Sequence, residues 1–277
     1  MTESSPPYPS TLSSNYPIIR RCFKDIEAIA GFRLTPQQRA SFLRYHAYIT
    51  TDPKPQYITE FRTTGRRYHI HVNGILGDAQ NALACVYYHL AHLDQMEIAV
   101  ERVIESSGLR ERLGESATAG GNTLALDFEY QAFVLSIRRC LDYLTRGLAI
   151  YFKNDFHSFR RLGAFLAKAM PQTVAIALRE AHARHVANFD FVLSESERRS
   201  TRDRISHYEF VPAGVVNISK RGFVLAGGGE NLLSYSSSPP PTLRQVLHSH
   251  ATNLQNCIDD LLDTFVDTTR KYEALVI

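Results

Sequence analysis

The chain has 277 residues, of which 44% are hydrophobic, so it is long enough to bury a substantial core as one decorated domain or two small ones. Its formal net charge of +3 and pI of about 8.6 do not require a nucleic-acid partner, although a local basic patch could still attract phosphate. No segment is long and apolar enough to span a membrane, and the N-terminus lacks the basic start and apolar run of a secretory signal. These features predict a cytoplasmic protein without a membrane partner.

The cysteines are too far apart in the sequence to form the close pairs of a zinc knuckle or a redox motif. The four cysteines are Cys22, Cys85, Cys140 and Cys257, and three of them lie within helical patterns. We therefore expect reduced, mostly packed thiols, and the sequence indicates no metal or other cofactor.

The N-terminal part of the chain differs in composition from the rest. Residues 1–17 are rich in Ser, Pro and Tyr and hold little that could anchor a core, which predicts a mobile arm. Residues 18–77 form an accessory segment. Within it, the alternating pattern that starts at Gln56, passes Thr64-Gly65 and ends at Val72 predicts a β-hairpin.

Residues 78–277 carry the pattern of a helical bundle. Apolar residues recur every three or four positions in several stretches, and such stripes must be buried against one another. Asp78 is the expected N-cap of the first long helix, and Gly108 is its expected stop. The expected helices cover residues 78–108, 134–151, 158–169, 171–192 and 247–272. The fold class is therefore mainly α, an up-and-down helical bundle.

An insertion at about residues 210–241 interrupts this bundle. The apolar runs 215–218 and 223–225 flank Lys220-Arg221-Gly222, which predicts a second small β-hairpin. The two hairpins are additions to a bundle and not its core.

The most informative motif is the stretch from Arg202 to His207. Arginine can neutralise a phosphate with two hydrogen bonds, and histidine can move protons near neutral pH, so the pair could cut a phosphodiester without a metal. On a helix these two residues would be about 140° apart around the axis, whereas Arg204 and His207 would be closer neighbours. The spacing alone leaves open which arginine would contact phosphate.

The motif is loose, and a structural interpretation is available for it. The pairs Arg66 and His71, Arg179 and His185, and Arg244 and His250 have similar spacings. In the structural interpretation, residues 202–204 form a solvated charged face, and His207 supports the chain before a strand at Phe210.

The motif resembles the hallmark of the HEPN superfamily. That hallmark is a four-helix bundle with an arginine, usually followed by Asn, Asp or His, and a histidine after four to six intervening residues. Residues 202–207 match this form, and the segment 136–144, with Arg138 and Asp142, is similar to a helix of bacterial HEPN-like proteins. The similarity covers about residues 78–273. The N-terminal arm, the first hairpin and the insertion depart from a minimal bundle.

The resemblance implies a metal-independent endoribonuclease that cuts RNA by attack of the 2′-hydroxyl and acts as a homodimer. His207 would act as general base or general acid, and Arg202 would stabilise charge on the phosphate. Asp203 would orient one of them, Arg204 would be a secondary phosphate contact, and the remaining supporting residues would be Arg138 and Asp142. RNA, a second copy, and an antitoxin or other protein are the implied partners. Some members have lost catalysis, so the alternative is a non-catalytic module that binds a nucleotide, a small ligand or a protein.

A third hypothesis places a metal on His182 and His185, whose spacing of three suits two ligands of one ion. No Glu-x-x-His pair of the di-iron type accompanies them. His185 also falls on an apolar stripe, which favours a histidine satisfied within the helix seam.

Overall fold

The computed structural model describes residues 11–108, 116–119, 122–193, 200–208, 210–213, 215–219, 222–224 and 242–276. The chain divides into two compact units, one ending at Leu34 and the other beginning at Thr35. Both are mainly helical. Within the described ranges, no helix combines the length and the apolar content needed to cross a bilayer.

The first unit contains one helix, α1 (Thr11–Ala30). Residues 11–17 of the predicted mobile arm are therefore helical, and residues 1–10 lie outside the described part. The helix ends where the N–H of Gly31 donates to the carbonyl of Glu27 at 2.7 Å. The predicted accessory segment is divided between the two units, because its first residues belong to α1.

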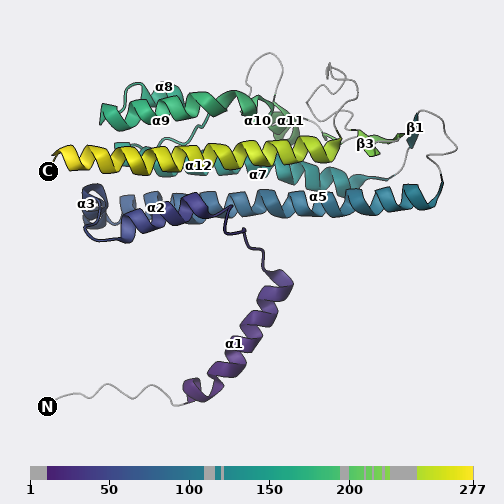
Figure 1. Ribbon diagram of the computed structural model, residues 1–277, viewed down its shortest axis with the longest axis horizontal. Helices are drawn as coiled ribbons and strands as arrows, with labels where there is room; N and C mark the ends of the chain where they lie inside the picture. Colours follow the sequence, from purple (N-terminus) through teal and green to yellow (C-terminus); the bar gives the residue numbers. More distant parts are fainter. Residues whose placement is uncertain are drawn as a thin grey trace. The chain divides into compact units, whose positions relative to one another are not determined.

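The second unit is a helical bundle. Its long helices pack in pairs, α5 on α7 and α12 on α9, and α12 also contacts α2 and α5 (Figure 1). The N-terminal elements are α2 (Ala40–Thr50), α3 (Gln56–Thr64), α4 (Arg66–Asn73), the π-helical η1 (Gly74–Ala79) and α5 (Gln80–Ser106). The following elements are α7 (Leu124–Ala149), η2 (Ile150–Phe152), α8 (Leu162–Leu166), α9 (Gln172–His185), η3 (Val186–Phe189), α10 (Asp190–Leu193), α11 (Thr201–His207) and α12 (Leu243–Val276).

The predicted first hairpin is wrong, because residues 56–72 form the helices α3 and α4. Tyr57, Ile58 and Phe61 are buried at helical spacing, so the apparent alternation was part of a helical stripe. Gly65, with φ of +51°, separates two helices rather than two strands. The predicted start at Asp78 is also wrong, because α4, η1 and α5 run on through it.

Three short strands accompany the bundle. They are β1 (Ser116–Ala119), β2 (Val215–Ser219) and β3 (Gly222–Val224), which pair antiparallel in the order β1, β2, β3. The predicted turn residues 220–221 and most of the insertion at 210–241 lie outside the described part. Pairing of β1 with β2 joins segments that are distant in sequence.

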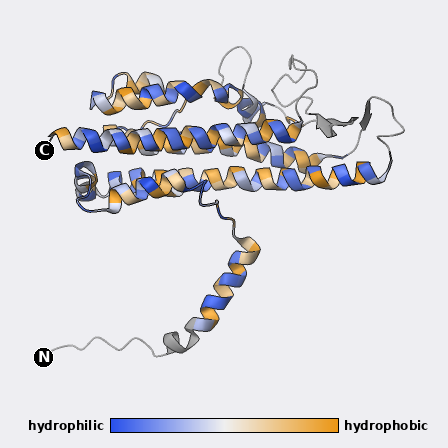
Figure 2. Ribbon diagram, viewed as in Figure 1, coloured by the Kyte–Doolittle hydropathy of each residue, from blue (hydrophilic) through white to orange (hydrophobic). Residues whose placement is uncertain are grey.

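The core follows the apolar stripes of α7 and α12. Apolar and polar residues recur in turn along α12 (Figure 2). The most buried residues recur every three or four positions: Val134, Ile137, Leu141, Leu144 and Leu148 on α7, and Leu254, Ile258, Leu261 and Phe265 on α12. Burying one such side chain contributes about 1.5–3 kcal/mol, so this seam dominates the stability of the bundle.

Two glycines allow η1 and α7 to approach closely. A Cβ atom on Gly74 would lie 3.2 Å from the Cα atom of Gly147. A Cβ atom on Gly147 would lie 2.6 Å from Cγ1 and 3.2 Å from the backbone nitrogen of Ile75. The backbones meet here at a distance that only glycine permits.

We predict that Gly147→Ala lowers the free energy of unfolding by about 1–3 kcal/mol, because the new methyl group overpacks a contact with main chain. Urea denaturation measures this change. Gly77→Ala is the matched control, since its Cβ would meet only the amide end of the exposed Asn73 side chain, which can rotate away. Equal stability of the Gly147 variant and the wild type would contradict the close approach.

Candidate ligand site at the end of the bundle

The predicted residues 202–207 lie on the short helix α11, which begins with a capping arrangement. The hydroxyl of Ser200 accepts the N–H of Asp203 at 3.1 Å and donates to Oδ2 of Asp203 at 2.9 Å. Arg202 donates to Oδ1 of Asp203 at 2.6 Å. Burial alone would raise the pKa of Asp203, but the hydrogen bonds from Arg202 and Ser200 outweigh it and lower the pKa. Asp203 therefore stabilises the helix start.

The helix continues to His207, so Arg202 and His207 project about 140° apart around its axis, whereas Arg204 and His207 share a side. His207 is exposed and lies beside the ring of Tyr208, with the ring centroids 6.1 Å apart. Neither Arg202 nor His207 lines the two large cavities of the bundle.

The predicted supporting residues on α7 connect structural segments. Arg138 donates to Asp142 at 2.7 Å and to the carbonyl of Val192 at 3.3 Å, and Asp142 accepts the N–H of Phe159 at 3.1 Å. The pair thus ties α10 and the segment before α8 to α7. The charge of Arg138 also acts on Asp203, so the structure brings these two predicted residues together electrostatically.

The predicted metal pair has separate partners. His182 donates from Nε2 to the carbonyl of Phe159 at 2.9 Å, and His185 lies 2.8 Å from Asp260, which also binds Arg184. Burial lowers the pKa of His182. Among the residues that the structure describes, no group of three or more His, Cys, Asp or Glu side chains is arranged to hold a metal ion.

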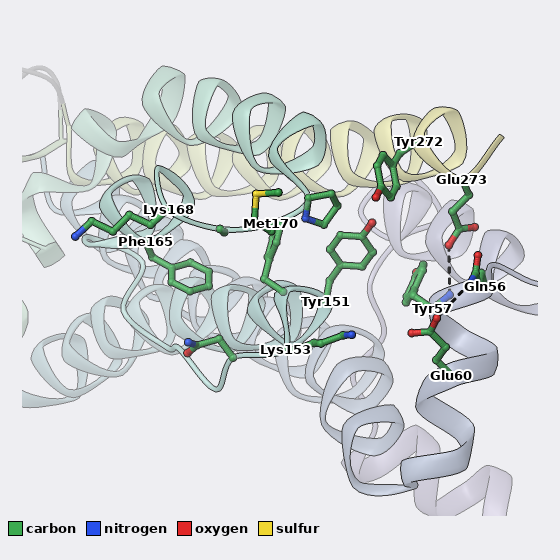
Figure 3. A pocket seen from close by; sticks show the side chains of 14 residues that line it. Gln56, Tyr57, Glu60, Tyr151, Lys153, Phe165, Lys168, Met170, Tyr272 and Glu273 are labelled. Atoms are coloured by element: carbon green, nitrogen blue, oxygen red, sulfur yellow. Dashed lines mark hydrogen bonds between the residues drawn. The ribbon is translucent and has the colours of Figure 1, made fainter. Parts of the chain in front are cut away.

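A cavity of about 740 Å³ lies where the C-terminal part of α12 meets the start of α3, the turn η2 and the connection from α8 to α9 (Figure 3). Five of its 14 lining residues are aromatic, and four are charged. The tyrosines and charged residues of the lining are Tyr57, Glu60, Tyr151, Lys153, Lys168, Tyr272 and Glu273.

Three tyrosines form the wall of this cavity on the side of α3 and α12. The rings of Tyr57 and Tyr151 meet edge to face, with centroids 5.0 Å apart, and Tyr272 lies near Tyr151 (Figure 3). Burial raises the pKa of both Tyr57 and Tyr151, and the charge of Glu273 raises both further. The phenols of Tyr57 and Tyr151 therefore stay uncharged at neutral pH.

Two carboxylates lie beside these tyrosines. Oε1 of Glu273 accepts the N–H of Tyr57 at 3.3 Å, and Oε1 of Glu60 accepts the side-chain N–H of Gln56 at 3.3 Å. Burial raises the pKa of Glu273, the hydrogen bonds from Tyr57 and Gln56 oppose this, and the charge of Glu60 raises it further. No described Lys, Arg or His forms an ion pair with either carboxylate.

The cations that line the cavity follow η2 and α8. Lys153 takes the left-handed conformation, with φ of 59°, directly after η2, and Lys168 comes two residues after α8. Both side chains are exposed and lie outside ion-pair distance of the two carboxylates. The cavity therefore has an acidic, tyrosine-lined side and separate lysines.

Behind Tyr57 lies a fully buried histidine, His71. Its Nδ1–H donates to the carbonyl of Gly147 at 2.6 Å, so Nε2 carries the lone pair, and that atom has no hydrogen-bond partner in the described protein. The ring contacts Tyr57 at 5.4 Å and Phe265 at 5.8 Å between centroids. Burial lowers the pKa of His71 to about 4, although the hydrogen bond to Gly147 opposes this.

Comparison with known proteins found no family model, curated protein or solved structure that matches this chain.

The sequence interpretation missed the residues of this cavity. Tyr57 and Glu60 were assigned to a hairpin, and Tyr151 and Tyr272 were assigned only to the apolar stripes of long helices. The available signal was the accumulation of tyrosines at the ends of those stripes. Because the residues come from four separated segments, only the tertiary structure brings them together.

We predict that the stability of the protein falls as the pH decreases from about 6.5 to about 4. The folded state lowers the pKa of His71 from 6.5 to about 4, so in this window the unfolded chain binds the proton more readily. The stabilisation is fully present above pH 6.5, and its loss is on the order of 3 kcal/mol. Urea denaturation across this range measures it.

The matched variants isolate His71 from the other titrating groups. His71→Asn retains a hydrogen-bond donor but cannot be protonated, so we expect a shallower loss of stability with falling pH. His46→Asn, at an exposed position on α2, should retain the wild-type slope. Identical slopes in wild type and the His71 variant would contradict the assignment.

Proposed function

We propose that this chain is a helical-bundle module that binds a small organic cation in the cavity at the end of α12. The observation that carries the proposal is the presence of Glu60 and Glu273, which have no ion-pair partner in the part of the chain that the structure describes, beside three tyrosines. Carboxylates supply charge, and aromatic rings attract an ammonium group through their electron-rich faces.

The environment of Glu273 supports a cation more than an anion. This carboxylate is partly buried, and the nearby Glu60 carries the same charge, so both effects disfavour its ionised form. A bound ammonium group would relieve both effects, whereas an anion would add to them. The cavity volume suits a small molecule, and aromatic side chains would cover its apolar part.

The two lysines of the cavity allow a cationic ligand to be distinguished from an anionic one. Lys153 lines the same cavity, so its positive charge opposes the binding of a cation. If the ligand instead carried a carboxylate or phosphate, Lys153 and Lys168 would favour it. Neutralising Lys153 therefore changes affinity in opposite directions for these two classes of ligand.

We expect tetramethylammonium or choline to raise the Tm of the protein, measured by thermal denaturation and checked by titration calorimetry. Glu273→Gln should weaken binding about tenfold, because one charge partner is lost, and Lys153→Gln should strengthen it. Binding should also tighten as the pH rises through the raised pKa of Glu273, since the ionised carboxylate is the form that attracts a cation.

Glu180→Gln is the matched control, because it removes an exposed carboxylate from α9 outside the cavity lining. It should leave affinity unchanged. Equal loss of affinity in the Glu180 and Glu273 variants would indicate a general effect of charge and contradict the site. Weaker binding of the cationic probe by Lys153→Gln would contradict a cation site beside this lysine.

The second candidate is a metal-independent endoribonuclease centred on Arg202 and His207. The observation that favours it is the exposed imidazole of His207 on the same short helix as Arg202 and Arg204, with the charge of Arg138 acting nearby. RNA would be the substrate. A second copy would supply the matching motif, and an antitoxin or other protein would regulate it.

If this second function holds, purified protein will cleave a mixed RNA pool in EDTA and leave 2′,3′-cyclic phosphate ends, and His207→Ala will lose the activity. His157→Ala, at another exposed histidine, is the matched control and should cleave normally. Cleavage that survives in the His207 variant would reject the assignment of His207.

A further inference from the structure

Helix α1 has an apolar face without a partner in its own unit. Four of its large apolar side chains are mostly exposed: Ile18 at 70%, Phe23 at 66%, Ile26 at 52% and Ile29 at 87%. With about 100° of rotation per residue, they lie with Ile19 and Cys22 in one arc of about 140°. A face of this kind is typical of a helix that packs on another surface.

The charged residues of α1 are arranged around this face in a regular way. Glu27 and Arg20 lie along one edge of the apolar arc, and Asp25 and Arg21 lie along the other. Lys24 lies on the opposite side of the helix. Each edge therefore carries a basic residue on the N-terminal side of Phe23 and an acidic residue on its C-terminal side.

A hollow on the same face has the form of a helix-packing hole. It is lined by Phe23, Ile26, Glu27 and Ala30, together with Gly31, and has a volume of about 360 Å³. The first four residues have the spacing i, i+3, i+4 and i+7, which defines the four-residue hole that receives one side chain of a facing helix. The geometry points to another helix as the occupant.

We propose that α1 pairs with α1 of a second copy of this chain, antiparallel and centred near Phe23. In an antiparallel pair, each edge of one helix lies against the same edge of the partner helix, which runs in the opposite direction. Arg20 then faces Glu27 of the second copy, and Arg21 faces Asp25 of the second copy. Ile19 of the second copy enters the hollow.

The charges select this orientation over a parallel one. In a parallel pair, the edge with Arg21 and Asp25 lies against the opposite edge of the partner helix, and each residue faces the partner residue five positions further on. Asp25 then lies opposite Ala30, and Arg21 lies opposite Ile26. That arrangement forms no ion pairs. Glu27 also binds Arg33 of its own chain, but through Oε1 alone, so Oε2 remains for the partner.

Sedimentation equilibrium of the full chain in reducing buffer tests this pairing. We expect a monomer–dimer equilibrium that Phe23→Asp abolishes without changing the Tm of the bundle. Arg20→Glu should weaken dimerisation about tenfold, because it creates two equivalent repulsions with Glu27. Combining Arg20→Glu with Glu27→Arg should restore wild-type affinity.

Lys24→Glu is the matched control, since it changes the net charge as Arg20→Glu does but lies on the opposite side of α1. It should dimerise like the wild type. A wild type that is monomeric at all concentrations would overturn the proposal and indicate that α1 docks elsewhere. Dimers that persist in Phe23→Asp, equal weakening by the Lys24 and Arg20 variants, or failure of the charge swap would overturn it as well.

Discussion

The close approach of η1 to α7 is the constraint on which the end of the bundle depends. Glycines at 74 and 147 let the two backbones meet, and the carbonyl of Gly147 is then within reach of the His71 imidazole. This hydrogen bond holds α4 against α7. His71 in turn contacts Tyr57, and Tyr57 contacts Tyr151, so the position of the cavity wall follows from the glycine contact.

The distribution of charge separates structural groups from the proposed ligand site. Asp260 on α12 binds both Arg184 and His185 of α9, and Asp142 neutralises Arg138 on α7. These carboxylates stabilise packing because their charges are compensated. Glu273 is also partly buried but has a like-charged neighbour and, among the described residues, no ion-pair partner, so its position is costly unless a ligand supplies the missing charge.

The arginine and histidine motif shows how a local pattern can serve more than one purpose. Asp203 caps the start of α11 together with Ser200, and this accounts for the acidic residue of the motif without invoking catalysis. Arg202 is bound to Asp203, whereas His207 is exposed at the helix end. Hydrogen bonds at the start of α11 thus explain Arg202 and Asp203, and the side chain of His207 is accessible to a partner or substrate.

The sequence by itself determined the mainly helical class and the helices with long apolar stripes. Apolar residues that recur with a period near 3.6 over many positions share one face only in an α-helix. The stripes of α7 and α12 were therefore predictable. The segment 56–72 was not, since a short apolar pattern around a glycine suits a hairpin as well as two helices, and tertiary burial of Tyr57 and Phe61 decided it. The cavity was decided only by the fold, because its carboxylates and tyrosines come from segments whose proximity depends on how the helices pack.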